Sequence, residues 1–447
     1  MDRDYILGKE KIQKSVLKIS SPSAISTVST VIYNIIDTIF IGRYVFSIGI
    51  AAVSLYLPIQ MMISSIAMLF ASGVGSFISR QLGKKNIDKA EKAVGTLVAF
   101  ILTISIILCI IGLVFTKDIV ELFGARGNAI YYASRYAEMM FIGILFNPLC
   151  LASNNVMRGE GSTKYSMIGT VISIISNIFL DFIFIVIFKW GVLGAGLATT
   201  IAKLINLLYV IYCFKFKTLL KVKLKYIKYD FKLIKECLPI GFSTFLNQFA
   251  GSISIMLLNN DLYHFGGNYV IAVYGIVFKL TSIIQKSVAG FNRGNQPLIG
   301  YNFGANNIKR VKEAVKWGFI FSTGVALIGT ILIMLFSKPL SEMFTTKLTL
   351  INYSSKILII ALLASPFLGM YFLSISFYRA IGKAKESIIL SLFRRVIFFI
   401  PLLYILPYGF NLGLEGIWIV LPLSNFISAL FAGTLLLRTL KTLKTTI

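Results

Sequence analysis

The sequence has few of the residues that build metal centres and catalytic sites. It contains one histidine, His264, and four cysteines, at positions 109, 150, 213 and 237, in no metal-ligand spacing. We therefore expect no transition-metal site, and we expect the thiols to remain free. An enzyme would need a nucleophile or base held beside a partner, and His264 stands alone. We expect neither catalytic residues nor a cofactor.

Acidic residues are also scarce, with 18 Asp and Glu against 44 Lys and Arg and a net charge of +26. Charged residues make up only 14% of the chain, hydrophobic residues make up 57%, and the mean hydropathy is +0.82. A soluble domain of this length could not cover so much apolar surface. Continuous apolar runs of 18 residues or more indicate an all-α, polytopic membrane protein. The lysines gather between the runs, so we expect them to contact lipid headgroups and not nucleic acid.

Twelve membrane spans are predicted, with six in each half of the chain. An even number in each half makes the halves parallel repeats, related by an axis along the membrane normal. Five prolines lie within the predicted spans, where each can bend its helix: Pro58, Pro148, Pro366, Pro401 and Pro422. The predicted spans are about 20–42, 50–78, 93–115, 130–156, 163–188, 192–214, 237–262, 269–298, 313–336, 351–377, 386–407 and 412–436.

The two halves also resemble each other in sequence. The segment from Gly83 to Val94 matches the segment from Gly304 to Val315 at an offset of 221 residues, which also places Arg158 on Arg379. A match at a fixed offset over half a chain indicates an internal repeat. We therefore expect an N-terminal lobe (1–214), a basic connector (215–236) and a C-terminal lobe (237–447), with the connector acting as a tether.

Basic residues are divided unevenly between the two sides of the predicted membrane. Of the 44 Lys and Arg, 31 fall at the termini, in the connector and in the even-numbered loops, whereas 8 fall on the opposite side. Loops rich in Lys and Arg remain in the cytoplasm. We therefore expect both termini and the connector to be cytoplasmic, in a multi-pass protein of the cell membrane.

Polar residues within the spans are candidates for function, because a buried charge is costly in a membrane. Asn34 and Asp37 share a face of span one, and Asn177 and Asp181 share a face of span five. Thr199 in span six could add a hydroxyl oxygen. Asp37 could instead lie at the outer headgroups, and Asp181 could serve helix packing. Together these oxygen donors suit a hard monovalent cation, or one proton shared by the two carboxyl groups.

Other side chains could line a substrate cavity. Methionine and aromatic linings suit varied apolar ligands, with ordinary helix packing as the alternative. Lys203 could neutralise a carboxylate or extend to the membrane surface. The second half has lysines in span eight and no acid in span ten, so the repeat is chemically asymmetric. The candidates for the cavity are Tyr33, Asn34, Gln60, Met61, Lys203 and Lys279.

These residues resemble the multidrug and toxic compound extrusion (MATE) family, and within it the MepA-like bacterial branch. The motifs are 34–42 (NIIDTIFIG), the span from Asn177 to Asp181, and 294–304 (GNQPLIGYNFG). The resemblance implies a two-lobe transporter that exports amphipathic, often cationic drugs by alternating access, in exchange for Na⁺ or H⁺. It also implies a bending point at Pro22. Carried over by matching residues, the cation site of the family falls on Asp37, Asn177, Asp181 and Thr199.

Other functions fit the sequence less well. Some relatives place further acids in spans seven, eight and ten, which this chain lacks. A lipid-linked saccharide flippase of the same wider superfamily is the alternative, but twelve spans and the acids of the first half disfavour it. A channel is disfavoured because no span repeats a filter motif or a ring of charges. We expect a monomer whose partners are small-molecule drugs and membrane lipid.

Overall fold

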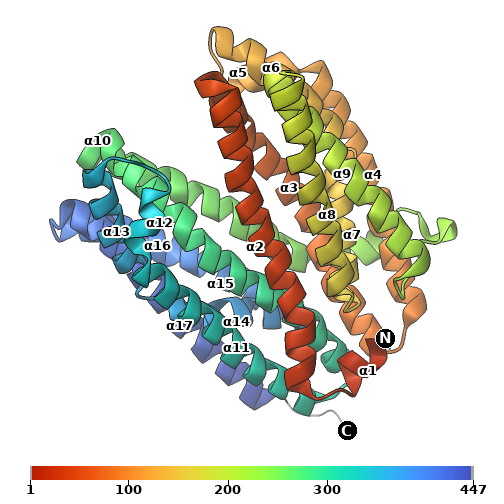
Figure 1. Ribbon diagram of the computed structural model, residues 1–447. Coiled ribbons are helices and arrows are strands. Elements are labelled where there is room, and N and C mark those ends of the chain that lie inside the picture. The colour runs from red at the N-terminus through yellow and green to blue at the C-terminus, as the bar shows by residue number, and fades with distance from the viewer. Residues whose placement is uncertain (1–2, 444–447) are drawn as a thin grey trace. The chain divides into compact units, whose positions relative to one another are not determined.

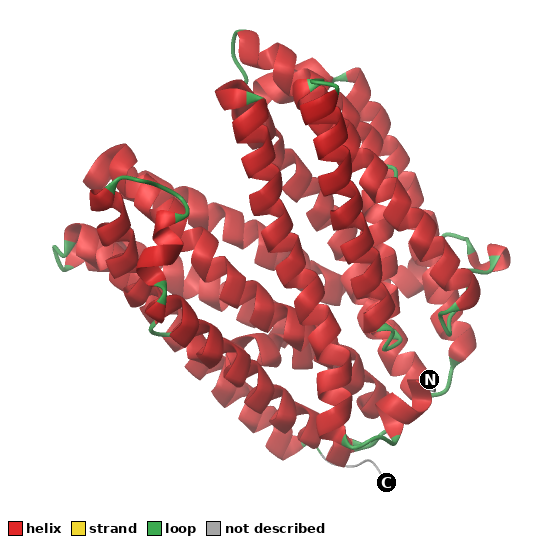
Figure 2. Ribbon diagram, in the orientation of Figure 1, coloured by secondary structure: helices red, strands yellow, loops and turns green. Residues whose placement is uncertain are grey.

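The computed structural model describes residues 3–443, and within this range every regular element is a helix (Figures 1 and 2). The side chains of residues 35, 38, 39, 42, 46–51, 128 and 129, together with both chain ends, lie outside the described part. Contacts between residues divide the chain into two units. The N unit is Ser29–Gly241, and the C unit joins Met1–Val28 to Phe242–Ile447.

The helices of the N unit follow one another along the first half of the chain. The helix α2 enters this unit from the C unit, and α10 leaves it. The bounds are α2 (Ile12–Tyr44), α3 (Phe46–Gly83), α4 (Ile87–Val114), α5 (Thr116–Leu122), α6 (Asn128–Gly143), α7 (Asn147–Gly159), α8 (Thr163–Asp181), the π-helix η1 (Phe182–Ile187), α9 (Gly191–Phe216), the 3₁₀ turn η2 (Leu224–Tyr226) and α10 (Phe231–Gly304).

The C unit contains the short N-terminal helix and the elements after α10. Its additional helices are α1 (Arg3–Gly8), α11 (Ile308–Leu335), α12 (Ser337–Glu342), α13 (Leu348–Leu362), the 3₁₀ turn η3 (Ser365–Phe367), α14 (Leu368–Ile381), α15 (Ala384–Leu392), the π-helix η4 (Phe393–Phe398), α16 (Phe399–Tyr404), the π-helix η5 (Ile405–Gly409) and α17 (Gly413–Thr442).

The helix lengths agree with the predicted twelve spans. Among the described residues, eight helices are long and apolar enough to cross a membrane, and two bent pairs bring the number to ten. The 74-residue α10 joins two spans across non-helical backbone at Gly267, and α2 supplies the first span. The bends of 43° and 41° fall just before Pro148 and at Pro366, where the missing N–H groups interrupt the helices.

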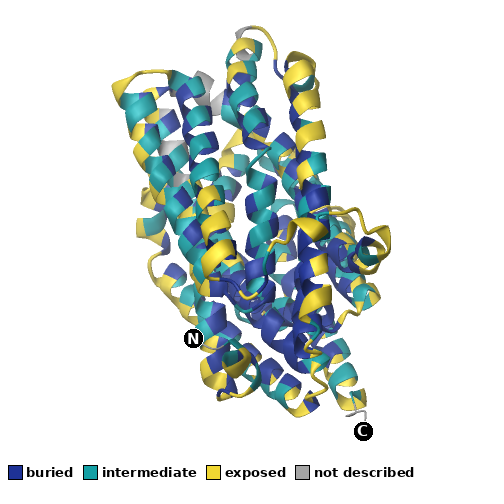
Figure 3. Ribbon diagram, turned by 90° about the vertical axis from the view of Figure 1, so that its right-hand side faces the viewer, coloured by how far each residue is buried: buried dark blue, intermediate teal, exposed yellow. Residues whose placement is uncertain are grey.

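Each unit has its own apolar core, and exposed residues dominate the loops in Figure 3. In the N unit, the rings of Tyr136 and Phe141 pack edge-on against Tyr56 at 5.6 and 5.8 Å. In the C unit, Leu358, Leu362 and other core side chains are fully buried. Many large apolar side chains outside these cores are exposed, as expected for surfaces that face lipid.

Two glycines allow α3 and the start of α10 to cross at backbone contact in the N unit. A Cβ atom built on Gly73 would lie 2.2 Å from the carbonyl oxygen of Cys237. A Cβ on Gly241 would lie only 1.6 Å from the carbonyl oxygen of Leu69. Lipid gives no hydrophobic force that drives helices together, so membrane helices associate largely through close packing. Small residues at a crossing allow that packing.

The connector lies on the N unit and is shorter than predicted. Because α9 continues to Phe216 and α10 begins at Phe231, the segment between them is residues 217–230. Tyr226 hydrogen-bonds Asp88, and its backbone passes so close to α4 that a Cβ on Gly95 would lie 2.3 Å from the Tyr226 carbonyl oxygen. The Tyr229 hydroxyl lies 2.5 Å from that of Thr103.

Two buried carboxylates hold the first part of this connector. Glu91 is 4% exposed; it accepts a hydrogen bond from the backbone N–H of Lys221 at 3.3 Å and forms an ion pair with Lys223. The Glu91 carboxylate raises the pKa of Lys223, so this ammonium group remains charged at neutral pH. Glu160, fully buried, accepts from the backbone N–H of Leu220 at 3.0 Å. The connector is therefore docked on the N unit, and its role as a tether stays a prediction.

The first residues of the chain belong to the C unit. The side-chain amide of Asn302 donates to the carbonyl oxygen of Leu7 at 2.9 Å, and the Arg310 guanidinium donates to that of Glu10 at 3.0 Å. Further along, α2 lies against α10 where a Cβ on Gly294 would be 2.5 Å from the Cα of Ser20. The helix α2 therefore begins in one unit and, beyond Val28, continues in the other.

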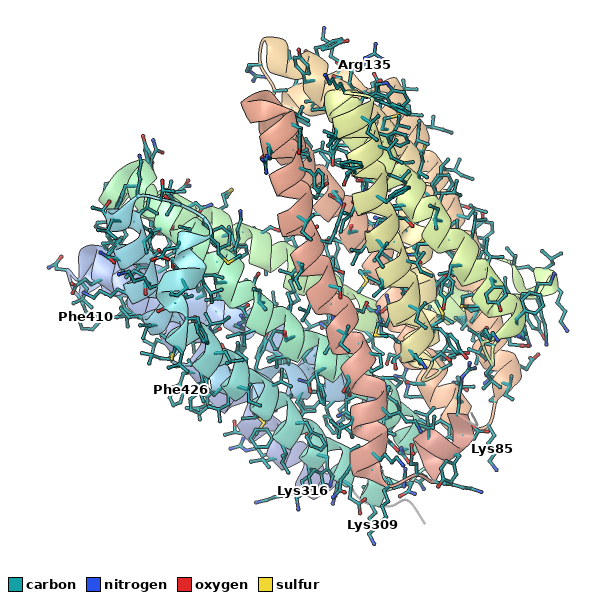
Figure 4. The ribbon with its side chains drawn as sticks, in the orientation of Figure 1. Lys85, Arg135, Lys309, Lys316, Phe410 and Phe426 are labelled. Atoms are coloured by element: carbon teal, nitrogen blue, oxygen red, sulfur yellow. The ribbon has the colours of Figure 1, made fainter. Side chains whose placement is uncertain are left out.

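The labelled side chains of Figure 4 mark the two ends of each unit. In the N unit, Lys85 and Arg135 extend from opposite ends of the bundle. In the C unit, Lys309 at the start of α11 and Phe410 lie at opposite ends. The orientation predicted from charge places Lys85 and Lys309 in the cytoplasm. Each lysine must then lie at the end of its unit that is opposite to the loops predicted outside the cell.

Candidate cation site

The two predicted carboxylates meet within the N unit. Asp37 lies on α2 and Asp181 is the last residue of α8, at the point where that helix passes into the π-helix η1. Asp181 is 1% exposed, and a side-chain hydrogen bond joins it to Asp37. Two carboxyl groups can share a hydrogen bond only when one carries a proton, because two carboxylates in contact repel each other.

Polar groups from three helices surround this pair. The Asn177 side chain, one turn before Asp181, satisfies its neighbours when its nitrogen donates to Tyr33 Oη (2.9 Å) and Asp181 Oδ2 (3.2 Å). Its oxygen then accepts from the backbone N–H of Thr199 at 3.1 Å. Tyr33 also hydrogen-bonds the side chain of Thr199. The helices α2, α8 and α9 each contribute to one buried polar cluster.

The cluster has spare capacity for a cation. The Oδ1 atoms of Asp37 and Asp181 are buried, and neither has a hydrogen-bond partner among the described residues. Buried acceptors without partners are costly and need an ion, a proton or water. The remaining donors are carboxyl, amide and hydroxyl oxygens, which suit a proton or a hard cation better than a soft metal. Across residues 3–443, no group of three His, Cys, Asp or Glu is placed to hold a metal ion.

A pocket opens beside this cluster in the same unit. Thr199 lines it, together with the predicted residues Gln60 and Lys203, and apolar side chains that include Tyr56 and Met140. Thr199 therefore contacts both the carboxyl cluster and the pocket. In the described residues Lys203 forms no ion pair with Asp37 or Asp181, so it stands in the pocket wall and does not neutralise the pair.

Comparison with known families identifies the chain. The family model described as MatE matches residues 22–183 and 239–405, one match in each half. The chain belongs to the MatE family. The two matches begin at Pro22 and at Pro239, so they follow the internal repeat of this MatE protein.

Relatives of this MatE chain include proteins of the predicted branch. The multidrug export protein MepA of Staphylococcus aureus strain bovine RF122 is 31% identical over 430 residues, which cover 96% of this chain and 94% of that protein. The MepA of Staphylococcus saprophyticus is 29% identical over 96% of this chain and 94% of the relative. The resemblance to the MepA-like branch is therefore confirmed.

Solved structures share the fold of this MatE chain. The structure of MATE in complex with MaD3S superposes with a TM-score of 0.93 at 24% identity, covering all of both chains. An outward-facing multidrug resistance MATE family transporter of the MOP superfamily gives a TM-score of 0.92 at 24% identity, over 100% of this chain and 99% of that one. These likenesses confirm the predicted all-α, multi-pass membrane fold.

Several predicted residues of this MatE protein lie away from the cluster. Asn34 is exposed on α2, and Met61 is 56% exposed on α3, so neither lines the pocket beside Thr199. Lys279 belongs to the C unit, where its ammonium lies 5.5 Å from the ring of Phe344. The helix α2 continues through Pro22 without a break, so bending there stays a prediction.

One group near the site was not predicted from the sequence. Tyr136 on α6 is buried, and it interacts electrostatically with Asp37, Asp181 and Tyr33. Its ring also packs against Tyr56, which lines the neighbouring pocket. Nothing in the sequence near Tyr136 marks it, because a tyrosine in an apolar span is usually a packing residue. Only the folded arrangement brings its hydroxyl towards the carboxyl pair.

Proposed function

We propose that this protein exports amphipathic, often cationic drugs, and that Asp37 and Asp181 couple export to an inward flow of cations. The observation that supports this proposal is the hydrogen-bonded carboxyl pair with two unpartnered buried oxygens. Multidrug export is the role named for the MepA relatives that match almost the whole chain. The same relatives favour drug export over saccharide flipping.

The direct contact between the carboxyl groups favours a proton over Na⁺ as the coupling ion. A shared proton explains why two carboxyl groups lie within hydrogen-bond distance. A sodium ion would need the two groups separated around it, with Asn177 and Thr199 supplying further oxygens. We therefore propose that one proton binds to the pair in this conformation and that its release accompanies drug binding.

Thr199 couples the cation site to the drug pocket, because it contacts both. It hydrogen-bonds Tyr33 in the carboxyl cluster and also lines the neighbouring pocket. A ligand that displaces this hydroxyl changes the partners of Tyr33 and Asn177, and through them the preferred protonation of the pair. Ion and drug then favour different conformations, as alternating access requires. The protein acts as a monomer in the cell membrane, with both chain ends in the cytoplasm.

The test is ethidium transport by protein reconstituted into liposomes, with either a pH gradient or a Na⁺ gradient imposed. Asp37→Asn and Asp181→Asn keep the side-chain shape but cannot exchange a proton, so each should abolish gradient-driven transport. Asn177→Ala and Thr199→Ala should reduce it less, since each removes one neutral group. Asp118→Asn is the matched control, because Asp118 is an exposed carboxylate of the same unit.

The outcomes separate the parts of the proposal. Transport driven by Na⁺ alone would refute the shared proton while leaving drug export intact. Wild-type transport by both Asp→Asn variants would refute the coupling site. Movement of a lipid-linked saccharide without movement of ethidium would refute drug export itself.

A further inference from the structure

A second pocket lies wholly within the C unit, and its polar wall is basic. It opens between α10, η4 and α17, and its space is about 600 Å³ when the open solvent at its mouth is included. Arg394 and Arg395 line it together with Gln285 and Asn425, and apolar side chains such as Phe278 and Phe399 line the rest. It contains neither of the carboxylates proposed for coupling.

The two arginines of the pocket lie on the π-helical turn η4. Such turns occur frequently at functional sites. Ser254 supports the turn, because its hydroxyl donates to the carbonyl oxygen of Arg395 at 2.9 Å.

Arg394 is held in place by neutral groups only. It is 5% exposed; its Nε donates to Asn425 Oδ1 at 2.9 Å, and its Nη2 donates to Gln285 Oε1 at 3.0 Å. The guanidinium lies 5.0 Å from the ring centre of Tyr371 and 5.4 Å from that of Phe372. These contacts fix its direction without neutralising its charge.

No carboxylate among the described residues pairs with the positive charge of this region. Lys286 on α10 is repelled by Arg293 and by Arg395, and Arg395 also repels Arg394. None of the ion pairs found in residues 3–443 includes any of these cations. Asp261, a buried carboxylate of the same unit, accepts instead from Tyr408 at 3.0 Å. Uncompensated charge inside a membrane protein is costly and marks a functional site.

We propose that this basic pocket binds an amphipathic organic anion. A carboxylate, sulfonate or phosphate group would accept hydrogen bonds from Arg395 and Arg394, because guanidinium groups match such anions in charge and shape. The apolar part of the ligand would lie against Phe278 and Phe399. This site does not depend on the proposed coupling at Asp37 and Asp181, and its preferred ligand has the opposite charge to a cationic drug.

Two sources could supply such an anion: a dissolved aromatic acid or the headgroup of an anionic lipid. The purified protein is therefore titrated with two probes, naphthalene-1-sulfonate and dioctanoyl phosphatidic acid. Neutral 1-naphthol and zwitterionic dioctanoyl phosphatidylcholine are the respective controls. We expect one anionic probe to bind about tenfold or more tightly than its control, the effect of one charge-assisted hydrogen bond. The probe that does so identifies the source.

Variants connect that preference to the pocket. Arg395→Gln should remove the preference, whereas Arg395→Lys should keep part of it because the charge remains. Lys356→Gln removes one exposed positive charge of the same unit outside the pocket and should change nothing. Gel filtration and thermal unfolding check that each variant is folded, and Arg395→Met, which also removes the charge, replaces Arg395→Gln if the latter does not fold. Equal binding of anionic and control probes, or an equal loss in Lys356→Gln, would overturn the proposal.

Discussion

The docked connector gives a prediction whose size follows from the structure. Glu91→Ala removes the buried carboxylate that accepts from the Lys221 N–H and pairs with Lys223. A hydrogen bond to a charged group contributes about 1.5–3 kcal/mol. The connector should therefore open about 10–150 times more often, at about 1.4 kcal/mol for each factor of ten.

Trypsin measures this opening directly. The connector contains five lysines, at 217, 221, 223, 225 and 228, and each becomes a cleavage site when the segment leaves α4. When opening is fast relative to cleavage, the rate follows the open population. Cleavage into two half-chains should therefore accelerate by the same factor in Glu91→Ala.

Two further variants make the comparison specific. Lys223→Ala should accelerate cleavage much less, because the Lys223 side chain is 46% exposed and its ammonium keeps contact with water. Glu342→Ala, which removes an exposed acid of the C unit, should behave as the wild type. A Glu91→Ala protein that is cut at the wild-type rate would show that the connector is not held by this carboxylate.

Two other predictions concern packing and orientation. Gly241→Ala should destabilise the protein by about 1–3 kcal/mol, because its methyl group would overlap the Leu69 carbonyl oxygen, whereas Gly275→Ala on the same helix has open space and should be nearly neutral. Thermal unfolding followed with a thiol-reactive dye measures both, since all four cysteines are buried until the protein unfolds; equal melting temperatures would refute the close crossing. An impermeant maleimide added outside intact cells should label Arg135→Cys but not Lys225→Cys, and the opposite pattern would reverse the proposed orientation.

Much of the fold could be predicted from the sequence, because apolar length and repetition directly reflect the membrane. The predicted spans correspond to the long helices, and Pro148 and Pro366 fall at the bends. The helices α3 and α17 continue through Pro58 and Pro422, so a proline within a span does not by itself predict a break. The contact between Asp37 and Asp181 could be predicted from the family resemblance and from the i, i+4 spacing of Asn177 and Asp181. The position of Tyr136 near this pair could not be predicted, because it depends on how α6 packs.

The arginine pocket shows why other features were missed. Arg394 and Arg395 fall within a predicted span, but the other walls of the pocket come from α10 and α17, and only the packing of these helices brings the walls together. No pattern in the sequence signals the π-helical turn that carries the two arginines. The docking of the connector could not be predicted either, because its lysines indicated attraction to lipid. The contacts that hold it come instead from Glu91, Glu160 and two tyrosine hydroxyls.

Because residues 1–28 belong to the C unit, this unit cannot complete its folding until residues from the second half of the chain have been synthesised. Ser20 lies against Gly294, so the partner of the first span is synthesised about 270 residues later. At about 5–20 residues per second, roughly 15–55 s pass between the two events. During that time the buried Ser20 and Ser23 lack Gly294, their final neighbour on α10. The C unit can be completed only when translation is well into the second half, and it then includes a segment that was synthesised much earlier.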